Sequence, residues 1–170
     1  MTHAFGVASK KEMTGIHPFL YDVNMVAIAV SEQDFAAHDG LRTEPEQRQL
    51  VNRGASKTMN SMHRMQNDGF GHAVDNVPYI NGKLRWEWKP IYVIAVAMMK
   101  AVKQVNAERA AKGLKQHVLT WGAVWDRPFT EEHFGTTPES MERAVNAYVD
   151  RRRAMGKNAF IDGPHWEIRQ

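Results

Sequence analysis

Apolar residues recur three or four positions apart in two segments of the chain. This spacing predicts helices over 18–30 and over 90–112, while Thr137-Pro138 at the start and Gly156 after the end predict a helix over about 138–155. The apolar stripe of the first helix consists of Leu20, Val23, Ala27 and Val30, and that of the second consists of Ile94, Met98, Ala101, Val102 and Val105. Each stripe predicts one helix face that is buried in a core.

A further helix is predicted over 43–53 by its ends rather than by its apolar residues. Thr43 and Glu46 have the spacing of a capping box, and Gly54 follows as a stop. The next segment, 55–71, is rich in Ser, Asn, Gly and Asp, which predicts a long loop.

Shorter apolar segments bounded by turn residues predict strands. Asn81-Gly82 between two such segments is a strong hairpin signal, which implies antiparallel pairing. The predicted strands are 34–37, 72–77, 78–80, 83–86, 117–121 and 165–169. Helices and short strands alternate irregularly, so we expect an α+β fold: a single domain with a small antiparallel sheet flanked by helices.

Composition narrows the possible chemistry. The 170 residues contain no cysteine and eight histidines, with 22 Lys+Arg against 19 Asp+Glu. The absence of cysteine excludes disulfide scaffolds, Fe–S clusters and thiol nucleophiles. A formal charge of +3 is too small to indicate a nucleic-acid-binding protein, and we expect no nucleic-acid partner.

No targeting or membrane segment is expected from the sequence. The longest apolar runs, 25–30 and 91–99, are far shorter than the roughly 20 residues that a membrane span needs. The N-terminus lacks the charged-then-apolar pattern of a signal peptide.

Two segments have the residue types of a zinc site built from imidazole and carboxylate. In the first, His63 follows a loop and Asp75 lies on a predicted strand, so both side chains can face one point. In the second, Pro164 fixes the backbone just before His165. Asp162 lies three residues before that histidine, where a carboxylate can act as a general base beside the metal.

The order of these motifs resembles that of the zinc peptidases of the lysostaphin / D-alanyl-D-alanine peptidase / hedgehog superfamily. Within it, the chain is most similar to the phage L-alanyl-D-glutamate endopeptidases, which act as endolysins. The resemblance runs from about His17 to the C-terminus. The stretches that carry it include Gly40-Leu41-Arg42-Thr43, Gly54-Ala55-Ser56-Lys57, Ser61-Met62-His63, Gly71-His72-Ala73-Val74-Asp75, Trp121-Gly122 and Asp162-Gly163-Pro164-His165-Trp166-Glu167.

The resemblance implies a role for each matching residue. His63, Asp75 and His165 would be the ligands of one catalytic Zn²⁺, and Asp162 would be the general base for the attacking water. Arg42 would stabilise the oxyanion together with zinc. Two further residues, Gln47 and Ser61, would line the substrate cleft.

Two insertions distinguish the chain from the family pattern. Residues 64–70 separate His63 from the Gly71–Asp75 motif, and 126–161 separate Trp125 from the catalytic acid. We expect 126–161 to be a helical insert within the zinc peptidase domain 1–170, forming a lid or an arm near the cleft.

Each motif also has an ordinary structural interpretation. Gln47 can be a helix-surface residue, and Ser61 can be a loop cap. Arg151–Arg153 can be a solvated helix end or can touch an anionic envelope surface. His72 is expected to lie off the metal-facing side of its strand. The remaining histidines have no ligand-like partners, so we expect structural or solvated roles for His3, His17, His38, His117 and His133.

The resemblance implies an enzyme that hydrolyses the L-alanyl-D-glutamate bond in the stem peptides of bacterial peptidoglycan. We expect a monomer that is made in the host cytoplasm and reaches the wall after a separate protein permeabilises the membrane. One alternative is a D-alanyl-D-alanine carboxypeptidase or dipeptidase with the same zinc site. Another is a non-catalytic protein that binds wall or nucleic acid around a structural zinc.

Overall fold

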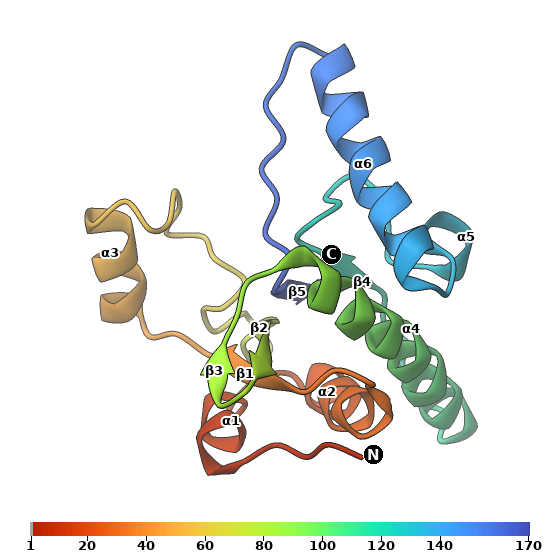
Figure 1. The fold of residues 1–170 in the computed structure, drawn as a ribbon. Coiled ribbons are helices and arrows are strands. Elements are labelled where there is room, and N and C mark those ends of the chain that lie inside the picture. The colour runs from red at the N-terminus through yellow and green to blue at the C-terminus, as the bar shows by residue number, and fades with distance from the viewer. Residues whose placement is uncertain (1) are drawn as a thin grey trace.

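The structure is a computed structural model that describes residues 2–170. Over this range the chain forms a five-stranded antiparallel sheet and six helices (Figure 1). The strands are β1 (Phe35–Asp39), β2 (Ala73–Ile80), β3 (Lys83–Leu84), β4 (Leu119–Trp121) and β5 (His165–Ile168). The helices are α1 (Val7–Glu12), α2 (Pro18–Val30), α3 (Glu44–Asn52), α4 (Trp88–Ala111), α5 (Glu131–Phe134) and α6 (Pro138–Ala154). The predicted α+β class, with helices around a small antiparallel sheet, is confirmed.

Strand β5, near the end of the chain, lies between β2 and β4. The sheet order is β1-β2-β5-β4, and β3 pairs with β2 alone. The register places Asp75 of β2 opposite His165 of β5, and Trp121 of β4 opposite Trp166 of β5. Paired residues of neighbouring antiparallel strands point to the same face of a sheet. Asp75 and His165 therefore share one face.

The other face of the sheet packs on helices α2 and α4. Val74 and Trp166 are buried there, and Trp166 stacks on Trp121 with 5.2 Å between ring centroids. Asn76 exchanges two side-chain hydrogen bonds of 3.0 Å with Asn24 of α2. Because strand side chains alternate between faces, burying Val74 and Asn76 against the helices turns Asp75 to the opposite side.

The structure differs from the predicted elements mainly at the ends of the strands. β2 runs without interruption from 73 to 80, β3 stops at Leu84, and β4 begins at Leu119 rather than at 117. The predicted hairpin turn is present, with Asn81 and Gly82 at φ values of 52° and 77°, as a two-residue hairpin turn with two positive φ values requires.

Two short helices, α1 and α5, were not predicted. Six and four residues respectively are too few to show a periodic apolar stripe. Helix α1 packs on β1, where the hydroxyl of Ser9 accepts a hydrogen bond from the backbone N–H of Ala37.

The insertion at 64–70 forms a compact turn of its own. Gln66 and Phe70 are joined by a backbone hydrogen bond of 2.8 Å, and Met65 bridges to Gly71. The N–H of His72 then donates to the carbonyl of Met62. The extra residues therefore leave the two flanking motifs side by side.

Between residues 2 and 170, no helix combines the length and the apolar character that a bilayer span requires.

Candidate metal centre

Three side chains from distant parts of the sequence converge on one point. His63 Nε2, Asp75 Oδ1 and His165 Nδ1 lie 3.2 Å from one another in all three pairs. In the described part of the chain, this is the one group of three or more His, Asp or Glu residues whose donor atoms come close enough to share a metal ion. Both histidines are buried, and Asp75 is partly buried.

The sheet and one loop position these three donors. Register pairing fixes Asp75 against His165. His63 lies in the loop after α3, where its carbonyl accepts a hydrogen bond of 2.8 Å from the N–H of Arg42. The sequence placed these residues on a loop and two strands, and the structure brings them together as predicted.

A second partner orients each imidazole. The Nδ1 of His63 lies 2.8 Å from the carbonyl oxygen of Gly40, and the Nε2 of His165 lies 2.8 Å from a carboxylate oxygen of Glu167. Such partners fix the ring tautomer and leave the other nitrogen free to bind a metal. Sequence reasoning did not single out Glu167. Its signal was strand alternation, because a residue two positions after His165 points to the same face.

The electrostatics of the cluster favour an anionic Asp75 between two imidazoles. Burial alone would raise the pKa of Asp75, but hydrogen bonds with His165 and His63 hold it well below its ordinary value. Burial would lower the pKa of His165, whereas the carboxylates of Asp75 and Glu167 raise it to about 9.

Asp162 lies beside the donors with its carboxylate unengaged. In residues 2–170 that carboxylate has no hydrogen-bond or ion-pair partner, and the side chain lines the same cleft as the three donors. Burial first, and then the charge of Asp75, raises its pKa. A free carboxylate with a raised pKa is a suitable proton acceptor.

Gly122 clamps the turn that carries Asp162. Its carbonyl accepts from the N–H of Asp162, and its own N–H donates to the carbonyl of His165, both at 2.8 Å. A Cβ at position 122 would lie 2.5 Å from the carbonyl oxygen of Asp162, so no side chain fits there. The Trp121-Gly122 motif therefore holds the turn that carries Asp162 against the sheet.

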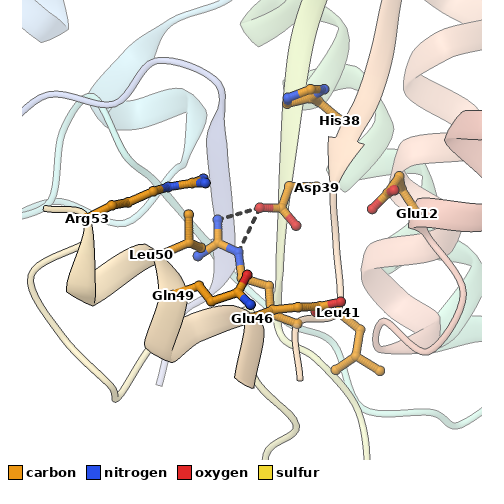
Figure 2. Close-up of a pocket in the computed structure, with 9 residues that line it drawn as sticks. Glu12, His38, Asp39, Leu41, Glu46, Gln49, Leu50 and Arg53 are labelled. Carbon is orange, nitrogen blue, oxygen red and sulfur yellow. Dashed lines mark hydrogen bonds and ion pairs between the residues drawn. The ribbon is translucent and has the colours of Figure 1, made fainter. Parts of the chain in front are cut away.

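Arg42 lines both the cleft of the candidate metal centre and a second pocket, which is the one drawn in Figure 2. Its Nε donates to Asp39 at 2.7 Å, and its Nη2 lies 3.7 Å from the outer oxygen of Asp75. Figure 2 shows the Asp39 side chain directed at this guanidinium, with dashed lines marking the contacts. Asp39 was not singled out from the sequence, although it precedes the Gly40–Arg42 motif directly.

Gln47 differs from the expectation that it lines the substrate cleft. Its side chain is fully buried and accepts a hydrogen bond of 3.1 Å from Arg42. Its amide donates to the hydroxyl of Ser56 and to the carbonyl of Thr58. From its buried position, Gln47 therefore links the loop of Ser56 and Thr58 to Arg42. It neither lines the cleft nor lies on the helix surface, the two roles expected from the sequence.

We expect Gln47→Ala to destabilise the protein by about 2 kcal/mol, because it leaves buried hydrogen-bonding groups without a partner. Chemical denaturation followed by far-ultraviolet circular dichroism measures this. The neighbouring exposed Gln49→Ala is the matched control and should change stability by less than about 0.5 kcal/mol. Equal effects of the two substitutions would contradict the tethering role.

Ser61 fits both of its predicted roles. It lines the cleft, and its hydroxyl also accepts a hydrogen bond of 3.2 Å from the N–H of His63. The contact fixes the backbone just before the His63 ring.

The metal centre opens into a cleft of about 520 Å³. One wall is the loop 54–62, which follows α3, and the other includes Trp125 and Phe160. These two rings stack with 6.2 Å between centroids, at the two ends of the 126–161 insert. In Figure 1, α3 and α6 lie on opposite sides of the sheet. The end of the insert, at Phe160, therefore forms part of the cleft wall.

The other clustered histidines do not form a second metal site. The Nδ1 of His17 accepts a hydrogen bond from the N–H of Phe19, and the Nδ1 of His72 lies 3.3 Å from the amide nitrogen of Gln170. Both rings therefore carry their proton on Nε2, which faces Asp68. In residues 2–170, the donor atoms of these histidines do not gather closely enough with other His, Asp or Glu residues to share a metal ion. His72 is a neighbour of the centre, as predicted.

The arginines at the end of α6 are mostly engaged. Arg151 makes two hydrogen bonds of 2.8 Å to Asp126, and Arg152 donates to the carbonyl of Asn158. These contacts hold the insert together and weaken the expectation of an envelope contact at Arg151–Arg153.

Comparisons with known proteins show the family to which the chain belongs. The model of the family described as phage L-alanyl-D-glutamate peptidase matches residues 1–133, which include Arg42, His63 and Asp75. The L-alanyl-D-glutamate peptidase of Escherichia phage T5 is 31% identical over 129 residues, which are 74% of this chain and 84% of that protein. The crystal structure of the Serratia marcescens L-Ala D-Glu endopeptidase ChiX matches with a TM-score of 0.65 and 26% identity, covering 99% of this chain and 91% of that one. The chain therefore belongs to the phage L-alanyl-D-glutamate peptidase family.

Proposed function

We propose that the protein is a zinc-dependent endolysin that hydrolyses the L-alanyl-D-glutamate bond in peptidoglycan stem peptides. The observation that carries this proposal is the convergence of His63, Asp75 and His165 beside the unengaged carboxylate of Asp162. A purely structural zinc would need neither that carboxylate nor a ligand set of three.

The donor set fits one zinc ion. Two imidazole nitrogens and one carboxylate oxygen are ligand types that zinc takes, and three protein ligands leave a fourth position open. Gly40 and Glu167 supply the orienting contacts that metal-binding histidines need. When bound, a zinc ion supplies Lewis acidity, which polarises the scissile carbonyl and makes a water molecule more acidic.

The chain's own residues perform the proton transfers and stabilise the developing charge. Asp162 accepts a proton from the attacking water and returns it to the leaving amine. The guanidinium of Arg42, held by Asp39, stabilises negative charge that develops on the carbonyl oxygen. Hydrolysis in this scheme needs no covalent intermediate with the protein.

The proposal treats residues 1–170 as one zinc peptidase domain, with 126–161 inserted beside the cleft. It includes action as a monomer on peptidoglycan, after release from the host cytoplasm through a membrane permeabilised by another protein. Weak contact with the anionic envelope is proposed only for Arg153, since Arg151 and Arg152 are engaged within the insert.

Purified peptidoglycan tests the bond and the metal together. We expect new amino termini on D-glutamate, no release after chelation with EDTA, and recovery with about one equivalent of zinc. Amino-terminal labelling of the products and metal analysis of the protein measure these outcomes. Released D-alanine would instead indicate a carboxypeptidase, and zinc binding without any product would indicate a non-catalytic protein.

A further inference from the structure

Lys57 is a cation in the cleft that no carboxylate of residues 2–170 neutralises. It lies in the loop after α3, is exposed, and lines the cleft together with the metal centre. The other Lys or Arg side chain in the cleft wall, Arg42, is paired with Asp39. Among residues 2–170, Lys57 has no carboxylate within salt-bridge distance.

Two carboxylates without an arginine or lysine partner in residues 2–170 also line the cleft. They belong to Asp162 and Glu167. A bound zinc ion would offset negative charge at its three donors, and Lys57 is the unpaired cation elsewhere in the cleft lining.

Phe160 holds the Lys57 side chain toward the cleft. The ammonium nitrogen lies 5.7 Å from the centroid of the Phe160 ring, within the range of a cation–π contact. Phe160 in turn stacks on Trp125. The contact spans the cleft, since Lys57 belongs to one wall and Phe160 to the other.

The proposed substrate brings a carboxylate to this cleft. A D-glutamyl residue has two carboxyl groups, and at most one of them continues the peptide. At least one free carboxylate therefore lies on the residue directly after the scissile bond. We propose that Lys57 binds this carboxylate and so selects a D-glutamyl residue at that position, with Phe160 as its positioning residue. This inference rests on the proposed function.

Two synthetic peptides test the inference, one with the L-alanyl-D-glutamate sequence and one with the free carboxylate of the D-glutamyl residue converted to an amide. We expect Lys57→Met to raise KM for the carboxylate peptide roughly tenfold, as loss of one charge-assisted hydrogen bond predicts, with kcat changed by less than about threefold. On the amide peptide, Lys57→Met and the wild type should have equal kcat/KM. Lys57→Arg should restore most of the carboxylate preference, and Phe160→Ala should lose part of it on the carboxylate peptide alone.

The control is Lys100→Met, which removes an exposed lysine of α4 outside the cleft and should change neither peptide. Equal cleavage of both peptides by the wild type would overturn the role of Lys57 and leave the proposed function intact. An equal loss on both peptides in Lys57→Met would also overturn it. Cleavage of neither peptide by the zinc-loaded wild type would overturn the proposed function and this inference together.

Discussion

Asp162→Asn is expected to lower kcat by about 100- to 10,000-fold while the protein keeps its zinc and its fold. The amide has the shape of the carboxylate but cannot accept the proton of the attacking water. The backbone of residue 162 is held by Gly122, and the carboxylate has no hydrogen-bond or ion-pair partner within residues 2–170, so little else changes. Turnover of the L-alanyl-D-glutamate peptide and metal analysis of the same preparation measure the two effects separately.

The matched control for this experiment is Asp150→Asn, which replaces an exposed carboxylate on α6 by an amide. It should retain wild-type kcat and wild-type zinc content. If Asp162→Asn retained wild-type turnover, Asp162 would not be the general base, and the proposed mechanism would fail at that step.

In contrast to Asp162→Asn, Asp75→Asn is expected to lower the affinity for zinc. Activity at limiting zinc should fall with it. Asp75 supplies the anionic ligand and contacts both histidines, while its outer oxygen faces Arg42. Outer partners of metal ligands are worth about 10- to 100-fold in affinity, so the loss of a ligand's own charge should exceed about 100-fold.

Competition with a chromophoric chelator gives the zinc dissociation constants of wild type, Asp75→Asn and Asp162→Asn. The pair separates binding from chemistry, because one variant should lose the metal and the other should keep it. A wild-type dissociation constant in Asp75→Asn would show that the ion binds elsewhere. Far-ultraviolet circular dichroism verifies that each variant is folded.

Local patterns were enough to predict the four longer helices and the hairpin. The apolar spacing over 18–30 matches α2 at both ends, and the capping box at Thr43 and Glu46 is present at the start of α3. Asn81-Gly82 formed the turn that its sequence requires. In each case the information lies within a few residues, where spacing and backbone preference decide the outcome.

The tertiary pairing was not predictable in the same way. Nothing local places β5 between β2 and β4, although this arrangement sets Asp75 opposite His165. The candidate metal ligands were proposed through motif order, whereas Glu167 and Asp39 were missed because their partners are set by side-chain orientation. Gln47 was misplaced for the same reason, since a helix of nine residues does not reveal which polar side chain turns inward.

The insert between β4 and β5 leaves the sheet and returns to it at nearly the same place, where Trp125 meets Phe160. The entropy cost of closing a loop grows only slowly with its length. During evolution this segment could therefore lengthen, shorten or exchange its helices, while the strand register that holds Asp75 and His165 stayed constant. Variation there would reshape one wall of the cleft and leave the reaction unchanged, so that substrate range and chemistry could be selected separately within one small domain.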